Sequence, residues 1–394
     1  PYIPKPPQGT ADHTLVMYLA GNNSLQSYLE DNVEDVIASV DASTPSDNGR
    51  IVVFFRPRPT SGDPMLLQIY YDKKIGTQCD TLRTYPSTIS SSAPETLRTV
   101  MADVERVAPA KEYSLVFGSH ATGWFTKECM SRGSLSRPLS IGIGESGDDG
   151  SFWQKSGDEI TRTFGLDGKV DYNGKKIDDP GMEIAEMATI LSGYNVRSLI
   201  FDACFMANVE SIYDLRNNAK YIVGSPCEIM GAGFPYANIM PELLKGNGIS
   251  YDLEAVCRKF NEDYAANPGY SGTVALFDCA QLDGLAQAVK RVNNAEKKEY
   301  KLSNIQSYEG LSPHVFFDLG DYVDKMCADE AAKSAFNEQL NRTVLSKYTL
   351  DTFLSMYGTS GRYKIDVFTG MSTSAPSPLY RSAYEQTSWY KATH

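Results

Sequence analysis

Residues 196–216 read Val196-Arg-Ser-Leu-Ile-Phe-Asp-Ala-Cys-Phe-Met-Ala-Asn-Val-Glu-Ser-Ile-Tyr-Asp-Leu-Arg216, and their pattern indicates the fold class. Residues 196–201 form a mostly apolar run that predicts a strand, and residues 205–216 carry a helical pattern. A strand that leads into a helix indicates a crossover connection and therefore parallel pairing. Asp202 and Cys204 lie where the strand ends, which is where open α/β sheets bind their ligands.

The same alternation of strand and helix extends outward along the chain. Strands are predicted at 13–19, 51–55, 65–71, 113–117, 221–224, 273–277 and 363–371, and helices at 25–40, 94–107, 236–244, 251–266, 280–297, 313–327, 330–345 and 383–391. A hairpin turn at Asn173-Gly174 and a helix start at Asp179-Pro180 are also expected. The fold class is therefore α/β with a mainly parallel central sheet.

Length and composition predict how this chain is organised. At about 150 residues per domain, 394 residues suggest about two packing units. We expect an extended proline-containing tether at 1–12, a catalytic domain at 13–250 with an insertion at about 121–180, and a smaller, mostly helical subdomain at 251–394. Four of the first seven residues are proline, which we interpret as a segment left after removal of a leader, and this interpretation predicts export.

Charge and apolar patterning exclude several classes of partner. The formal net charge is −12, which disfavours binding to nucleic acid or to an anionic membrane surface. No apolar run reaches the 18 or so residues of a membrane span, so the protein is expected not to span a membrane.

The seven cysteines are spread without close spacing, which indicates neither a disulfide framework nor a metal site and leaves at least one thiol free. The acidic pairs Asp148-Asp149 and Asp178-Asp179 are interpreted as solvated turns or helix caps rather than calcium ligands. No G-x-S-x-G, Walker or GxGxxG motif occurs, so serine hydrolase and nucleotide-binding functions lack their usual motifs.

Two residues at predicted strand ends are candidates for catalysis. His120 follows the strand 113–117, and Cys204 follows the strand 196–201 just before the expected helix. Taken singly, a histidine at a strand end and a free cysteine are more often structural. The N-terminus of a helix lowers the pKa of a thiol, so the position favours a Cys–His pair in which Cys204 is the nucleophile.

At these residues the chain resembles the clostripain family of cysteine peptidases, which belongs to one clan with caspases, legumains and gingipains. Three motifs carry the resemblance best: Leu15-Val-Met-Tyr-Leu-Ala-Gly-Asn-Asn-Ser-Leu25, His120-Ala-Thr-Gly-Trp124 and, above all, Ile200-Phe-Asp-Ala-Cys-Phe-Met-Ala-Asn-Val-Glu210. Phe317-Asp-Leu-Gly-Asp321 and Thr387-Ser-Trp389 extend it over nearly the whole chain. The resemblance implies a caspase-like three-layer sandwich and a cysteine endopeptidase.

The resemblance also implies roles for individual residues. His120 would act as the base and Cys204 as the nucleophile, with the backbone amides of Ala121 and Cys204 holding the oxyanion. Cleavage after Arg or Lys is implied, and we name Asp202, and less strongly Glu228, as the acidic partner of the basic side chain.

Family members are often zymogens that cut themselves between the histidine and the cysteine. By resemblance this points to Lys127, Arg132 or Arg137 as self-processing sites. Calcium dependence is possible by resemblance, although the sequence holds no ligand motif, so no cofactor is expected. The expected partners are protein or peptide substrates, the expected state is a monomer, and the expected location is secreted, periplasmic or tethered to a bacterial cell surface.

Departures from the family pattern support an alternative function. The usual Asp-His-Gly is Ser119-His120-Ala121 here, which adds a methyl group where the substrate backbone should pass, and the Asp-Asn pair of the first motif is Asn22-Asn23. In addition, 84 positions separate His120 from Cys204, which implies the insertion at about 121–180. Ala121 and this long insertion motivate the alternative, a catalytically silent relative that acts as a binding or scaffold protein.

Overall fold

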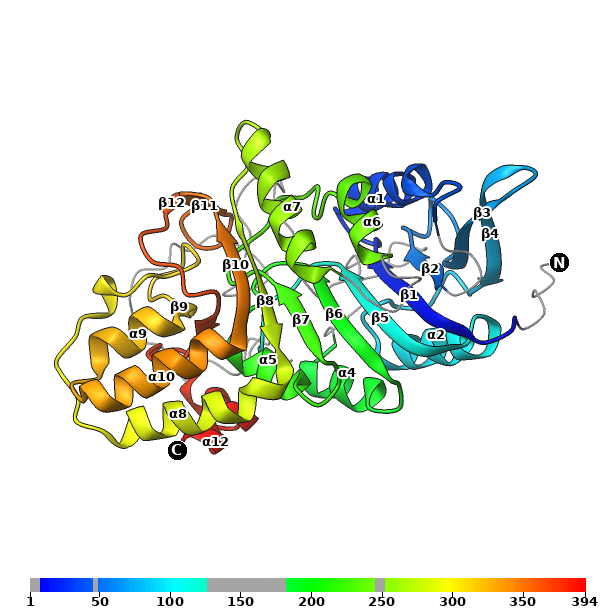
Figure 1. The fold of residues 1–394 in the computed structure, drawn as a ribbon. Helices are drawn as coiled ribbons and strands as arrows, with labels where there is room; N and C mark the ends of the chain where they lie inside the picture. Colours follow the sequence, from blue (N-terminus) through cyan, green and yellow to red (C-terminus); the bar gives the residue numbers. More distant parts are fainter. Residues whose placement is uncertain (1–7, 45–48, 126–181, 245–251) are drawn as a thin grey trace.

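The computed structural model describes residues 8–44, 49–125, 182–244 and 252–394. Its centre is a nine-stranded sheet with the strand order β10-β8-β7-β6-β5-β1-β2-β3-β4 (Figure 1). The strands are β1 (Ala11–Ala20), β2 (Gly49–Arg56), β3 (Met65–Asp72), β4 (Gly76–Thr84), β5 (Ala110–Gly118), β6 (Val196–Asp202), β7 (Tyr221–Gly224), β8 (Thr273–Asp278) and β10 (Val344–Thr349).

The middle of the sheet is parallel. Strands β2, β1, β5, β6 and β7 pair in parallel, whereas β3, β4, β8 and β10 add antiparallel pairs at the two sides. The parallel strands are apolar runs buried on both faces, which is typical of strands covered by helices on both sides. The predicted mainly parallel α/β sheet is thus confirmed.

Helices cover both faces of the sheet and complete three layers (Figure 1). One face carries α1 (Gln26–Ser39), α6 (Tyr236–Leu243) and α7 (Leu253–Ala266), and the other carries α2 (Pro94–Val107), α4 (Ile184–Leu191) and α5 (Val209–Leu215). Helix α2 shows why these segments are helical: Pro94 starts it, and its apolar residues recur on the face that is buried.

The C-terminal part of the chain is richer in helices, as expected. It contains α8 (Leu282–Asn294), α9 (Leu319–Met326), α10 (Glu330–Thr343), α11 (Arg381–Tyr384) and α12 (Ser388–Thr393), with short pairs formed by β9 (Phe317–Asp318) and β13 (Ser372–Thr373) and by β11 (Thr352–Ser355) and β12 (Gly361–Lys364). The same part also supplies β8 and β10 to the central sheet, so the two sides of the expected boundary at residue 251 share one sheet. The boundary itself stays a prediction.

The helix predicted at 205–216 is wrong at its start. Helix α5 begins only at Val209, because Phe205 has a positive φ of 60°, which no α-helix accommodates. Two backbone bonds hold the residues before α5 in a turn: Phe205 N–H donates to the Cys227 carbonyl at 3.2 Å, and Ala207 N–H donates to the Ser225 carbonyl at 3.0 Å.

The residues that the structure describes contain neither a membrane-spanning helix nor a disulfide bond. No helix there has both the length and the apolar character needed to cross a membrane. The six cysteines there (Cys79, Cys204, Cys227, Cys257, Cys279 and Cys327) are free thiols.

Candidate active site

Strand pairing brings His120 and Cys204 to one edge of the sheet. Strands β5 and β6 are parallel neighbours, and Gly118 of β5 pairs with Asp202 of β6. His120 and Cys204 each lie two residues beyond these partners, so both follow the carboxyl ends of adjacent strands about 4.8 Å apart. This is the position that the sequence predicted for them.

Residues 119–125 after β5, which we call the histidine loop, pack directly on residues 203–208 after β6, which we call the cysteine loop. A Cβ atom at Gly123, three residues after His120, would lie 2.6 Å from Nδ2 of Asn208 and 3.1 Å from the Phe205 carbonyl oxygen. Gly123 also has a positive φ of 65°, a conformation that glycine adopts without strain. The close approach of the histidine loop to the cysteine loop therefore requires glycine at this position.

The turn after Cys204 is held in an unusual conformation. Phe205 is a large residue with a positive φ, and its ring stacks on Phe316 with the ring centroids 5.0 Å apart. The Asn208 side chain donates to the Phe205 carbonyl and accepts a bond from Ser211 N–H at 2.9 Å, which caps α5. Such backbone strain persists only where surrounding contacts enforce it, and it gathers at functional sites.

The environment of the Cys204 sulfur differs from the expected one. Helix α5 begins five residues after Cys204, so the N-terminus of the helix does not lie next to the thiol. The prediction that this helix N-terminus lowers the pKa of the Cys204 thiol is therefore wrong. Instead, the backbone N–H of Ile229 lies 3.4 Å from Sγ of Cys204, where it can donate to a thiolate. The Cys204 side chain is fully buried, and His120 is 6% exposed.

A buried polar network joins both loops to the C-terminal part of the chain. Trp124 of the histidine loop donates from Nε1 to Oγ of Ser374 at 2.8 Å. Oε1 of Glu210, in α5, accepts from the Thr373 hydroxyl at 2.8 Å and from Ser374 N–H at 2.9 Å. Burial raises the pKa of Glu210 to about 7, although these bonds oppose the rise. Residues 373 and 374 thus hold the loops together.

The two predicted acidic partners, Asp202 and Glu228, are both buried carboxylates. Asp202 accepts from Phe234 N–H at 3.2 Å and from the Tyr236 hydroxyl at 2.7 Å, whereas Glu228 accepts from Met356 N–H with both oxygens, at 3.1 and 3.0 Å. In this structure each carboxylate therefore fixes a neighbouring segment of the chain.

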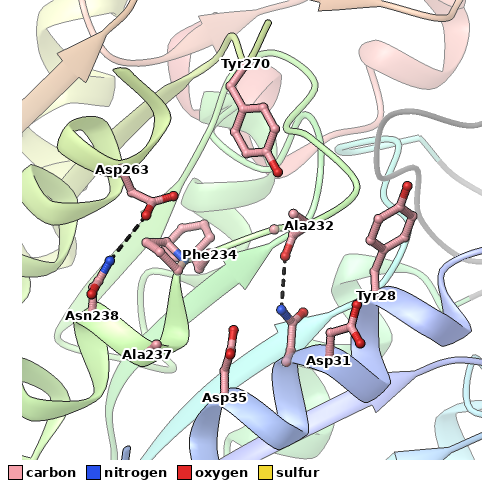
Figure 2. Close-up of a pocket in the computed structure, with 12 residues that line it drawn as sticks. Tyr28, Asp31, Asp35, Ala232, Phe234, Ala237, Asn238, Asp263 and Tyr270 are labelled. Atoms are coloured by element: carbon pink, nitrogen blue, oxygen red, sulfur yellow. Dashed lines mark hydrogen bonds between the residues drawn. The ribbon is translucent and has the colours of Figure 1, made fainter. Parts of the chain in front are cut away.

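An acidic pocket adjoins the segment that Asp202 fixes. Figure 2 shows that it lies between α1, the start of α6 with the segment that leads into it, and the end of α7. The pocket volume is about 280 Å³. Its lining residues are Tyr28, Asp31, Asn32, Asp35, Ala232, Gly233, Phe234, Pro235, Ala237, Asn238, Asp263 and Tyr270. Sequence reasoning missed these residues, because they gather only when α1, α6 and α7 pack together.

Electrostatics in this pocket favour a positive charge. Burial, followed by repulsion from the carboxylates of Asp31 and Asp263, raises the pKa of Asp35. Burial also raises the pKa of Asp263, although the hydrogen bond that Asn238 Nδ2 donates to it at 3.2 Å acts to lower this pKa. Both shifts would be relieved by a cationic group.

Other predicted site features have the following places in the structure. Ala121, the expected oxyanion donor beside Cys204, is buried directly after His120. The expected self-processing residues Lys127, Arg132 and Arg137, the insertion beyond residue 125, the hairpin at 173–174 and the helix start at 179–180 lie outside the described residues. In the described ranges, no group of three His, Cys, Asp or Glu residues is placed to hold a metal ion.

Comparison with solved structures places this architecture among known proteases. A secreted C11 cysteine protease from Bacteroides thetaiotaomicron, called iotapain, is 29% identical and superposes with a TM-score of 0.81 over 98% of this chain and 100% of its own. An inactive zymogen C11 protease from Parabacteroides distasonis is 26% identical, with a TM-score of 0.76 over 98% of this chain and 99% of its own.

A third similar structure is a clostripain from Bacteroides thetaiotaomicron in complex with the peptide inhibitor BTN-VLTK-AOMK. It is 37% identical over 54% of this chain and 95% of its own, with a TM-score of 0.51. No curated protein matches the chain.

The fold and these neighbours define a caspase-like cysteine-type peptidase. The model of the clostripain family matches residues 147–392, more than half of the chain. The chain belongs to the clostripain family, and the resemblance noted in the sequence is confirmed.

Proposed function

We propose that this peptidase hydrolyses peptide bonds with Cys204 as the nucleophile and His120 as the base. The observation that carries the proposal is the placement of both residues two positions beyond paired residues of the neighbouring strands β5 and β6. His120 takes the thiol proton, and Sγ attacks the scissile carbonyl carbon. Collapse of the tetrahedral intermediate breaks the C–N bond as the imidazolium gives its proton to the leaving amine, and a thioester remains.

Water completes the cycle. His120 removes a proton from the water that attacks the thioester, and the carboxylic acid leaves as the thiol is restored. The negative oxygen formed in each half needs hydrogen-bond donors, and we assign this role to the amides of Ala121 and Cys204. The N–H of Ile229, 3.4 Å from Sγ, supports the thiolate before attack.

Turnover of a peptide substrate by matched variants tests the mechanism. Cys204→Ala and His120→Ala should each reduce turnover to background, while Cys227→Ala, which changes another buried cysteine, should retain it. Folding of every variant is checked by its thermal transition. Full turnover by folded Cys204→Ala or His120→Ala would refute the mechanism, and the absence of turnover in wild type that has been cut by limited trypsin digestion would favour the silent relative.

We infer that cleavage follows Arg or Lys. Negative charge lies in and around the segment 228–238, whose Ile229 contacts Cys204: Glu228 belongs to the segment, Asp202 accepts hydrogen bonds from Phe234 and Tyr236 in it, and the carboxylates of the acidic pocket lie along it. A clostripain relative binds an inhibitor whose peptide part reads VLTK, which ends in lysine. An acidic surrounding offsets the cost of desolvating a basic side chain.

A panel of peptides that differ only before the scissile bond tests this preference. The ratio of kcat/KM for Arg or Lys over Leu should exceed about 100, since a charge-paired hydrogen bond contributes about 1.5–3 kcal/mol and Coulombic attraction adds to it. Asp202→Asn should lower this ratio if Asp202 is the partner of the basic side chain, and Glu228→Gln should lower it if Glu228 is the partner. Asp35→Asn should lower the ratio only if the carboxylates of the acidic pocket contribute to the preference. Equal hydrolysis of Arg, Leu and Asp peptides would refute the preference.

We propose that the chain is made as a zymogen. The full burial of Cys204 supports this, since a covered sulfur is closed to substrates that arrive from solution. A relative with 26% identity is an inactive zymogen. Cleavage after Lys127, Arg132 or Arg137 would activate the enzyme, and only wild type, not Cys204→Ala, should then yield fragments of about 130 and 260 residues, counted from these positions. Equal cutting of both proteins would exclude self-processing.

The remaining features are proposed from the same relatives. We propose a secreted bacterial monomer that acts on protein or peptide substrates, since one similar protease is described as secreted. We propose that it needs no cofactor, so turnover should be equal in EDTA and in added calcium.

A further inference from the structure

A serine from a third strand end contacts the candidate base. Oγ of Ser24 lies 3.4 Å from Nε2 of His120. Strand β5 lies between β1 and β6, and Leu19 of β1 pairs with Gly118 of β5, which pairs in turn with Asp202 of β6. The chain therefore brings Ser24 to His120 from the β1 side and Cys204 from the β6 side.

The turn that carries Ser24 is fixed by its own hydrogen bonds. Oδ1 of Asn23 accepts from Leu25 N–H at 2.8 Å, and Nδ2 of Asn23 donates to the Ala20 carbonyl at 2.9 Å. Gly21 N–H donates to the Arg56 carbonyl at 2.8 Å, which attaches the turn to β2. The backbone that carries Ser24 is therefore held in place before substrate binds, as a positioning group requires.

The contact determines how the imidazole can be used. A base needs an unprotonated nitrogen toward the thiol, so the neutral ring must carry its proton on the other nitrogen. When Nε2–H donates to Oγ of Ser24, Nδ1 is the nitrogen that exchanges a proton with Cys204. The same bond stabilises the imidazolium, since both ring nitrogens are then donors. The distance of 3.4 Å is long for a hydrogen bond, and such contacts often shorten when substrate binds.

We propose that Ser24 is a positioning residue for His120: it accepts the Nε2 proton, orients the ring and directs Nδ1 to Cys204. This inference rests on the proposed Cys204–His120 mechanism. It predicts that the hydroxyl, and not merely the volume of the side chain, matters for the rate.

The test compares wild type with Ser24→Ala, Ser24→Thr and Ser27→Ala. Ser27→Ala is the matched control, because Ser27 is an exposed serine in the first turn of α1. We measure kcat and KM from pH 5 to 10 in activated enzyme, and the rate at which iodoacetamide alkylates Cys204. Ser24→Ala should lower kcat about 10-fold with little change in KM, the size expected for one hydrogen bond to a charged group. Ser24→Thr should recover most of the loss, and Ser27→Ala should match wild type.

The pH profile separates a positioning role from a structural one. Without the acceptor the imidazolium is less stable, so the alkaline decline of kcat should move to lower pH in Ser24→Ala. Titratable or charged groups on the neighbouring elements include Asp202 at the end of β6, Cys204 after β6, Arg58 after β2 and Glu210 in α5, and all of them are the same in every variant. A shift between variants therefore reports the loss of the hydroxyl.

Each outcome decides between the two proposals. Unchanged kcat and pH profile in Ser24→Ala, while Cys204→Ala is inactive, would overturn the role of Ser24 alone. Equal loss in Ser24→Ala and Ser24→Thr, or a loss without a pH shift, would also overturn it, since the hydroxyl would then not be responsible. Turnover by Cys204→Ala would refute the mechanism itself, whatever the result at Ser24.

Discussion

Replacing Gly123 by alanine tests the contact between the histidine loop and the cysteine loop. Two costs add at this site. An alanine with a φ of 65° costs about 1–2 kcal/mol relative to glycine. The new Cβ would also lie 2.6 Å from Nδ2 of Asn208, 3.0 Å from the Phe316 ring and 3.1 Å from the Phe205 carbonyl, and such overpacking costs about 1–3 kcal/mol.

We therefore expect Gly123→Ala to lower the free energy of unfolding by about 2–5 kcal/mol. It should also lower kcat by up to about 100-fold, because displacement of a loop by about 1 Å misplaces the reacting groups. Urea denaturation gives the first quantity, and peptide turnover by the folded fraction gives the second.

Gly76→Ala is the matched control. Gly76 has a positive φ of 81°, and a Cβ there would meet nothing within 4 Å, so the substitution carries the backbone cost alone. Gly76→Ala should lose about 1–2 kcal/mol and no activity. Equal stability of the two variants, or wild-type kcat in Gly123→Ala, would show that the two loops are not in the tight contact described above.

Two further substitutions test the network around the loops. Glu210 keeps a proton in the native state that the unfolded chain releases above its ordinary pKa of 4.5, because burial raises its pKa to about 7. The free energy of unfolding of wild type should therefore fall by about 3 kcal/mol as pH rises from about 4.5 to 7. Thermal melts of Glu210→Gln over the same pH range should lack this decrease, and parallel stability curves for the two proteins would contradict the raised pKa of Glu210. Asn208→Ala removes the cap of α5 and the tie to Phe205, and should cost about 1–2 kcal/mol in urea denaturation, whereas a loss below about 0.3 kcal/mol would show that the cap is not used.

Local patterns in the sequence predicted most of the sheet and its helices. Helix α2 and strand β7 have the predicted bounds, because the apolar periodicity and the flanking residues agree there. Strands β4 and β10 were not predicted, since their exposed positions carry polar residues that give no continuous apolar run. The strand predicted at 363–371 was wrong: only its start lies in β12, and β13 follows its end.

The site was predicted only in part, for a physical reason. His120 and Cys204 follow strands, and strand ends are visible in the sequence. The start of α5 could not be predicted from the sequence. The positive φ of Phe205 is imposed by a hydrogen bond to the Cys227 carbonyl and by stacking on Phe316, and both residues are distant in the chain. The contact of Ser24 with His120 depends on how β1 and β5 pair, which no local pattern reveals.

The central claim is that Cys204 is the nucleophile, and mapping of a covalent adduct tests it most directly. Wild type and Cys204→Ala are treated with a peptide electrophile that carries Lys, before and after limited trypsin digestion, and the modified cysteine is identified by mass spectrometry. Three other thiols serve as internal controls, because burial raises the pKa of Cys227 to about 11 and that of Cys257 and Cys279 to about 12.

In the cut wild-type protein we expect one adduct, on Cys204, formed at least about 100-fold faster than on Cys227, Cys257 or Cys279. A peptide that binds the site holds its electrophilic carbon beside Sγ of Cys204, whereas the other three thiols are buried and have a raised pKa. The uncut protein should react slowly, because the Cys204 side chain is fully buried. An adduct on another cysteine, or equal labelling of wild type and Cys204→Ala, would contradict the account.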